Sequence, residues 1–182
     1  MSRASNPVTL SSMRLLPLML LSLAACPGAG PGTFTGTVQG NGLEVKGAAL
    51  VANTEVWLSN VNDLCPKLKR NQFPKNGSIV KLVLKPVAAG EFNVVSSLST
   101  AMQNVATLQF IKLNDTCGNA LVFAESIGTS GKVTVNGYEA DQQIDGNFEA
   151  TFGSSDAVTG SFNAQYCDAP TLYPSPECVD VE

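Results

Sequence analysis

The stretch Asp145-Gly146-Asn147-Phe148-Glu149-Ala150-Thr151-Phe152 alternates polar and apolar side chains. Because successive side chains of a β-strand point to opposite faces, this alternation predicts a strand with one buried and one solvated face. The same pattern occurs before it in Gly131-Lys132-Val133-Thr134-Val135 and after it in residues 159–166. The C-terminal half is therefore predicted to be built from short strands.

Short alternating segments separated by Gly, Asn and Asp recur from Thr33 onward. The strand candidates are residues 34–38, 43–51, 55–61, 79–86, 91–96, 106–113, 132–138, 146–152 and 159–166. They predict an all-β fold, an antiparallel β-sandwich of about eight or nine short strands. Residues 60–70 combine capping residues with helical spacing and predict one short helix, whereas residues 119–126 fit either a strand or an irregular segment.

Glycine and asparagine mark the expected turns, because both accept the positive φ that tight connections require. The predicted turns are Gly40-Asn41-Gly42, Asn76-Gly77, Asn136-Gly137, Asp145-Gly146 and the segment Gly128-Thr129-Ser130-Gly131-Lys132. A Gly-x-Phe pattern recurs at Gly32-Thr33-Phe34, Gly90-Glu91-Phe92, Gly146-Asn147-Phe148 and Gly160-Ser161-Phe162. We expect each Gly to end a turn and each Phe to be the first inward-facing residue of the next strand.

The first 25 residues have the three-part layout of an export signal. Arg3 and Arg14 precede the apolar segment 15–23, and small residues then lead to a cysteine. The apolar segment is far shorter than the roughly 20 residues of a membrane-spanning helix. We therefore predict that residues 1–25 are a cleaved signal peptide.

The segment Leu23-Ala24-Ala25-Cys26 resembles the lipobox of bacterial lipoproteins, in which a dedicated peptidase cuts before an acylated cysteine. The resemblance implies that Cys26 is the lipidated first residue of the mature protein, with a diacylglyceryl group and an amide-linked acyl chain such as palmitate. Two or more acyl chains anchor a protein stably in a membrane. Pro27 follows the cysteine in place of the Asp associated with inner-membrane retention, which favours the outer membrane. The alternative is an ordinary signal peptide with a chance cysteine.

Residues 26–32 contain only Cys, Pro, Gly and Ala and are predicted to be a flexible tether. Residues 33–182 are predicted to form one β-sandwich domain with a Pro-rich, disulfide-closed C-terminal tail. The predicted signal peptide carries two arginines and no acid, so its removal shifts the formal net charge of the chain from −4 to −6. An acidic chain of this kind does not have the basic surface of a nucleic-acid binder.

Four further cysteines, Cys65, Cys117, Cys167 and Cys178, form an even set that predicts two disulfides in an exported chain. Three pairings are possible. The favoured one joins Cys167 to Cys178 across a short Pro-rich loop and leaves Cys65 with Cys117. Zinc is disfavoured because the chain has no histidine and no C-x-x-C pair.

The absence of histidine excludes Ser-His-Asp and Cys-His catalysis, and no cofactor is expected. The polar residues Asp141, Asp145, Asn147 and Glu149 offer the oxygen ligands that calcium prefers, but their spacing is not that of an EF-hand. A solvated strand face explains them better. Trp57, the only tryptophan, is predicted to be a core residue, with an exposed sugar platform as the alternative.

The C-terminal half, including the runs 131–135, 145–152 and 158–164 that lead to Cys167, resembles small uncharacterised lipoproteins of Gram-negative bacteria, myxobacterial ones in particular. The resemblance implies the same β-rich structure stabilised by cysteine pairs, and it carries over no activity, because that group has none assigned. We expect a non-enzymatic binding, adhesion or structural module of the envelope, held by its lipid, with an envelope protein or glycan as partner. The alternatives are an accessory subunit of an envelope complex and a small hydrolase that uses carboxylates such as Asp141 or Glu149.

Overall fold

The computed structural model describes residues 30–99, 101–171 and 176–180, and each of the nine predicted strand segments forms a strand within that part of the chain. Their bounds are β1 (Gly32–Thr35), β2 (Gly47–Val51), β3 (Glu55–Ser59), β5 (Ser78–Lys85), β6 (Gly90–Val94), β7 (Val105–Lys112), β8 (Gly128–Glu139), β9 (Gln143–Phe152) and β10 (Ala157–Cys167). The all-β class is confirmed.

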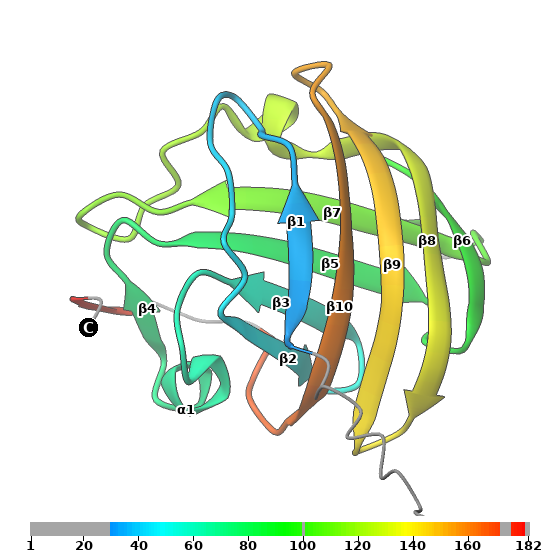
Figure 1. Ribbon diagram of the computed structural model, residues 1–182, viewed down its shortest axis with the longest axis horizontal. Coiled ribbons are helices and arrows are strands. Elements are labelled where there is room, and N and C mark those ends of the chain that lie inside the picture. Colours follow the sequence, from blue (N-terminus) through cyan, green and yellow to red (C-terminus); the bar gives the residue numbers. More distant parts are fainter. Residues whose placement is uncertain (1–29, 100, 172–175, 181–182) are drawn as a thin grey trace, which may run out of the picture.

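The nine strands belong to a single hydrogen-bonded sheet in the order β1-β10-β2-β3-β5-β7-β6-β8-β9. A further pairing between β9 and β10 closes this sheet on itself. Strands β1, β10, β9 and β8 lie side by side in front of the crossing strands β2, β3, β5 and β7 (Figure 1). Two layers therefore face each other, but they belong to one sheet and not to the two separate sheets of the predicted antiparallel sandwich. The sheet is mixed, because β10 pairs with β2 and β6 pairs with β7 in parallel.

The interior of the closed sheet is filled by one hydrophobic cluster, to which most of its strands contribute alternate residues. Phe92, Phe148 and Phe162 are buried there, and Phe34 packs against the cluster. The inward direction of the phenylalanines in the Gly-x-Phe pattern is thus as predicted.

Two glycines of this pattern lie in the middle of strands, where turns were expected. Phe148 in β9 is paired with Gly160 in β10, and Phe162 in β10 is paired with Gly146 in β9. A Cβ at Gly160 would lie 2.4 Å from the Phe148 ring, and one at Gly146 would lie 2.6 Å from the Phe162 ring. Each glycine therefore leaves space for the ring of its cross-strand partner.

A second hydrophobic cluster covers the opposite face of β2, β3 and β5. Helix α1 (Leu64–Lys69) lies in the predicted helical segment and contributes Leu64 and Leu68. Two short parallel strands, β4 (Gln72–Pro74) and β11 (Glu177–Val179), form a small separate sheet beside it. These two strands were not predicted, because three residues are too few to show an alternation.

The disulfides are Cys65–Cys167 and Cys117–Cys178, so all four cysteines are paired but not in the favoured combination. Cys65 in α1 bonds the end of β10, and Cys178 in β11 bonds the loop after β7. The favoured pairing rested on the short sequence separation of Cys167 and Cys178. The fold instead uses both bridges to hold the outer cluster against the sheet, which requires long-range partners.

The predicted turns have mixed outcomes. Asn76 and Gly40 have positive φ as expected, at 57° and 74°. Asn136-Gly137 and Asp145-Gly146 instead lie opposite each other within β8 and β9, and Gly128–Lys132 is the start of β8. The β8–β9 turn falls at residues 140–142, where Asp141 has a φ of 58°. Residues 119–126 contain a single 3-10 turn, Phe123–Ser126, and no named strand.

Candidate functional site

The lipobox residues Leu23, Ala24, Ala25 and Cys26 lie outside the described residues, so lipidation stays a prediction. Within the described part of the chain, no helix has the length and apolar character needed to cross a bilayer. The four remaining cysteines, the carboxylate group and Trp57 can all be placed.

Trp57 is buried, with 4% of its surface exposed, and its core role is confirmed. Its ring packs against Phe73 at a centroid distance of 6.0 Å, and its indole Nε1 donates a hydrogen bond of 2.8 Å to Glu55. Lys81 forms an ion pair of 2.8 Å with the same carboxylate. The tryptophan therefore belongs to the outer hydrophobic cluster and is not a sugar platform.

The four residues considered for calcium do not converge on one point. Asp141 lies in the β8–β9 turn, where its carboxylate accepts a hydrogen bond of 2.6 Å from Asn53 and its amide donates one of 3.0 Å back to that side chain. The other three alternate along β9 on its outer face. Among the described residues, no group of three Asp, Glu, Cys or His side chains is placed to hold a metal ion.

The phenol of Tyr166 lies near this turn at the end of β10. Burial raises the pKa of Tyr166, and the carboxylates of Asp168 and Asp141 raise it further. The tyrosine is therefore neutral at physiological pH and is not a candidate base.

The outer face of β8, β9, β10 and β1 is almost entirely polar, and we call it the polar face. Cross-strand neighbours on it include Thr134 beside Asn147 and Asn147 beside Ser161. Its residues are Thr33, Lys132, Thr134, Asn136, Gln143, Asp145, Asn147, Glu149, Thr159, Ser161 and Asn163. This is the solvated strand face that the alternation in residues 145–152 predicts, extended over four strands.

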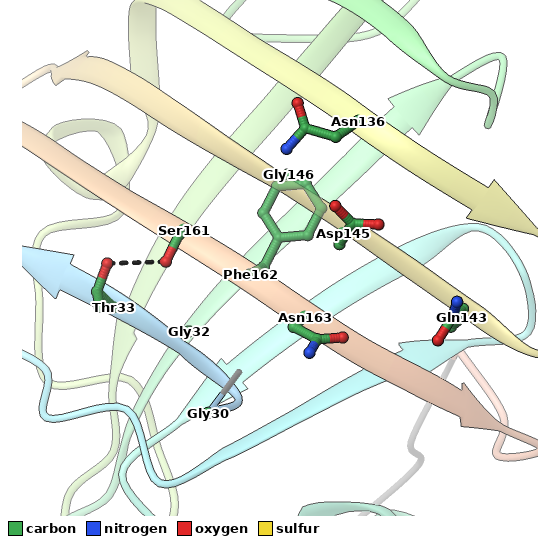
Figure 2. A pocket seen from close by; sticks show the side chains of 10 residues that line it. All are labelled: Gly30, Gly32, Thr33, Asn136, Gln143, Asp145, Gly146, Ser161, Phe162 and Asn163. Atoms are coloured by element: carbon green, nitrogen blue, oxygen red, sulfur yellow. Dashed lines mark hydrogen bonds between the residues drawn. The ribbon is translucent and has the colours of Figure 1, made fainter. Parts of the chain in front are cut away.

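A hollow of about 420 Å³ lies in the polar face where β1 begins. Figure 2 shows Asn136, Gln143, Asp145 and Asn163 along β8, β9 and β10, with Thr33 on β1 beside Ser161. Gly30, Gly32, Gly146 and Phe162 complete the lining.

Local backbone features create this hollow. The β8–β9 register shifts between Val135 and Gly137, which leaves Asn136 as an extra residue with an exposed side chain. Such bulges redirect side chains locally. Asp145 Oδ1 lies 2.5 Å from the position that a Cβ on Gly137 would occupy, so only glycine leaves room for this carboxylate orientation.

The lining combines hydrogen-bond donors and acceptors, with one charge. Asp145 is half-buried, and its carboxylate forms no hydrogen bond or ion pair with another described residue. Thr33 and Ser161 share a hydrogen bond of 2.9 Å, and Gln143 accepts one of 3.3 Å from Gln165. The carboxylate oxygens therefore remain available to hydroxyl or amino donors from outside.

Sequence reasoning identified Asp145 but missed Asn136, Gln143 and Asn163 as its neighbours. The alternation showed which way the residues of β9 face, but it did not give the pairing of β9 with β8 and β10. No family model, curated protein or solved structure matches the chain.

Proposed function

We propose that this protein is a lipid-anchored binding module of the bacterial envelope, attached through Cys26 to the outer membrane and without enzymatic activity. The observation that carries the binding role is the polar face with its hollow, in which Asp145 keeps free acceptor oxygens. The anchor is supported by the order of charged, apolar and small residues before Cys26. The two disulfides fit an oxidising compartment outside the cytoplasm.

The arrangement of the carboxylates supports binding over hydrolysis. Asp141 lies in the turn before β9, and the extended strand from Gln143 to Glu149 alone spans roughly 20 Å. Paired carboxylates that cleave a glycosidic bond lie about 5–10 Å apart. These two residues therefore do not form such a pair, and the hydrolase alternative would need another constellation.

The anchor is tested by expressing the full chain in a Gram-negative host with a clickable palmitate analogue. We expect label on the wild-type protein and its recovery with outer membranes, whereas Cys26→Ser gives an unlabelled protein that keeps residues 1–25, because the peptidase cuts only before an acylated cysteine. Ser22→Ala, outside the Leu23–Cys26 segment, is the matched control and keeps the label. Equal palmitate labelling of Cys26→Ser, or a wild-type protein without label, would rule out the anchor.

The binding role is tested by co-sedimentation of the full chain carrying Cys26→Ser with peptidoglycan sacculi and with outer-membrane vesicles. We expect sedimentation that falls when Ser161→Arg places a bulky charge in the polar face. Lys46→Glu, on the β1–β2 connection outside the polar face, is the control and sediments as before. A protein that sediments with neither material contradicts the proposal.

An accessory subunit of an envelope complex is a second candidate, favoured by two exposed apolar side chains. Val122 and Phe123 are 57% and 65% exposed, and Gln39 exchanges two hydrogen bonds with the Val122 backbone. Gln39 follows the end of β1, so this pair lies at the opposite end of that strand from Gly30. Photo-crosslinking from position 123 in cells is expected to yield one discrete adduct if the candidate is right, and position 115, which is exposed and outside the polar face, is the control.

A further inference from the structure

We infer that the hollow at the start of β1 binds neutral sugar units of a membrane-borne glycan. This inference rests on the proposed function, because it takes the anchor at Cys26 as given. It names the ligand class and the residues that would recognise it.

The lining chemistry fits hydroxyl groups. A sugar hydroxyl both donates and accepts a hydrogen bond, so neighbouring hydroxyls are best met by side chains that offer both functions or by a carboxylate that accepts two bonds. The hollow presents three amides (Asn136, Gln143, Asn163) around the carboxylate of Asp145. The hydroxyls of Thr33 and Ser161 stand at its other side.

The charge of the lining favours a neutral ligand. Among the described residues that line the hollow there is no Lys or Arg, and Asp145 is the single charged one. A phosphate or carboxylate group would meet this negative charge without a compensating cation. A cation would meet only one carboxylate, and an ion pair in exposed surroundings contributes little binding free energy. Polar uncharged groups are therefore the best match.

The hollow is also preformed. Its side chains project from hydrogen-bonded strands, and β9 is paired along most of its length with β8 on one side and β10 on the other. The hydrogen bond between Thr33 and Ser161 ties β1 to this framework. A ligand would thus order few side chains on binding, which keeps the entropic cost low.

The position of the hollow indicates where the ligand lies. Gly30 is part of the lining, and it lies four positions after Cys26 in the sequence. A fully extended chain of that length spans at most about 14 Å. An acylated Cys26 would therefore hold the hollow close to the membrane surface, within reach of sugar headgroups or of glycans attached to lipid.

The test uses the full chain carrying Cys26→Ser, so that acyl chains do not contribute, and follows ¹⁵N-labelled amides by NMR. The probes are neutral maltotriose and chitotriose, anionic glucose 6-phosphate, and vesicles with or without digalactosyl diacylglycerol. We expect shifts at Asp145 and Asn163 with a neutral sugar and none with the phosphate. Vesicle binding is expected to require the galactolipid.

Matched variants locate the site. Asn136→Ala is expected to weaken sugar binding about tenfold, the effect of one lost hydrogen bond at the upper end of the usual range. Asn62→Ala, an exposed position just before α1 and outside the polar face, is expected to bind as wild type. Circular dichroism of both variants reports that the fold is kept.

The outcomes separate the two proposals. No shift with either neutral sugar or with galactolipid vesicles, equal binding of glucose 6-phosphate, or equal loss in Asn62→Ala overturns the saccharide site. Binding of free sugar without any binding of galactolipid vesicles overturns the membrane-borne source. If the wild-type protein takes up no palmitate label but sugar binding is intact, the anchor is overturned and the saccharide site is retained.

Discussion

At the scale of single residues, Gly160 has a role that its position in a strand does not suggest. A Cβ added there would lie 2.4 Å from both the Phe148 ring and the Thr33 carbonyl oxygen. Gly160→Ala is therefore expected to lower the free energy of unfolding by about 1–3 kcal/mol through overpacking. Urea denaturation measures this difference.

Gly42→Ala is the matched control for Gly160→Ala, since the nearest atom to its added Cβ is 3.7 Å away. We expect no loss of stability there. If Gly160→Ala were as stable as the wild type, the ring would have to occupy another position, and the Gly–Phe pairs would not be packing features.

The carboxylate of Asp156, in the β9–β10 connection, also binds the β1–β2 connection through Gln39. Hydrogen bonds from the Ser154 hydroxyl and from the backbone N–H of Gln39, both 2.7 Å long, lower the pKa of Asp156 below its usual value of 3.8. A lowered folded-state pKa stabilises the protein at pH values above 3.8, and the contribution is lost as the pH falls through the folded-state pKa. Asp156→Asn is therefore expected to be less stable than wild type at pH 7, with the difference shrinking below about pH 3.8.

Urea denaturation of both proteins across pH 2–7, a range chosen around the carboxyl pKa values, measures the Asp156 effect. Asp115→Asn, an exposed carboxylate in the loop after β7, is the control and is expected to follow the wild type at every pH. A difference between Asp156→Asn and wild type that stays constant to pH 2 would show that the charge is not the stabilising feature.

At the scale of elements, the disulfides hold the outer cluster of α1, β4 and β11 against the sheet. Peptide mapping without reduction is expected to recover Cys65 linked to Cys167 and Cys117 linked to Cys178. The sequence separations are 102 and 61 residues, so each bridge restricts a long loop in the unfolded chain. Replacing either pair by alanine is expected to cost about 4 kcal/mol on the loop-entropy account.

Recovery of a peptide that links Cys167 to Cys178 would contradict this connectivity. It would also remove the reason for the parallel pairing of β11 with β4. Thermal unfolding of the two double-alanine variants tests whether each bridge stabilises the fold. Each variant is expected to unfold at a lower temperature than the wild type.

The strands also show which parts of the fold can be predicted from the sequence. Alternation located β9 and its neighbours because each buries one face and solvates the other. It failed at Asn136-Gly137 and Asp145-Gly146, since glycine in a strand gives the same local signal as glycine in a turn. Cross-strand partners decide between them: Gly146 faces the Phe162 ring, and this pairing is not encoded in local sequence.

The candidate site was predictable only in part for the same reason. Asp145 and its outward direction follow from the period-two pattern. Its amide neighbours depend on the register of β9 with β10, where Asp145 faces Asn163, and on the bulge that turns Asn136 outward. Likewise, the favoured Cys167–Cys178 bridge followed sequence proximity, whereas the fold brings Cys167 to α1.

At the scale of the whole molecule, the strands of the closed sheet differ in how many residues pair with neighbouring strands. β6 pairs with β7 through only two residue pairs, Asn93–Val105 and Val94–Ala106, and with β8 through four. β9 is paired along most of its length on both sides. Local opening costs least where few backbone hydrogen bonds and few buried contacts must break, so β6 is the expected opening point of the closed sheet.

Hydrogen–deuterium exchange measured by mass spectrometry tests this expectation under native conditions. Amides of residues 90–94 are expected to exchange well before those of residues 144–151, because opening at β6 leaves the β8–β9–β10 framework intact. Residues 106–110 of β7 serve as the internal control, since their antiparallel pairing with β5 would persist and keep them protected. Simultaneous exchange of β6 and β9 would instead mean that the sheet opens only by global unfolding. Protection of β9 during opening at β6 would keep the polar face assembled while the molecule fluctuates, as a rigid binding face requires.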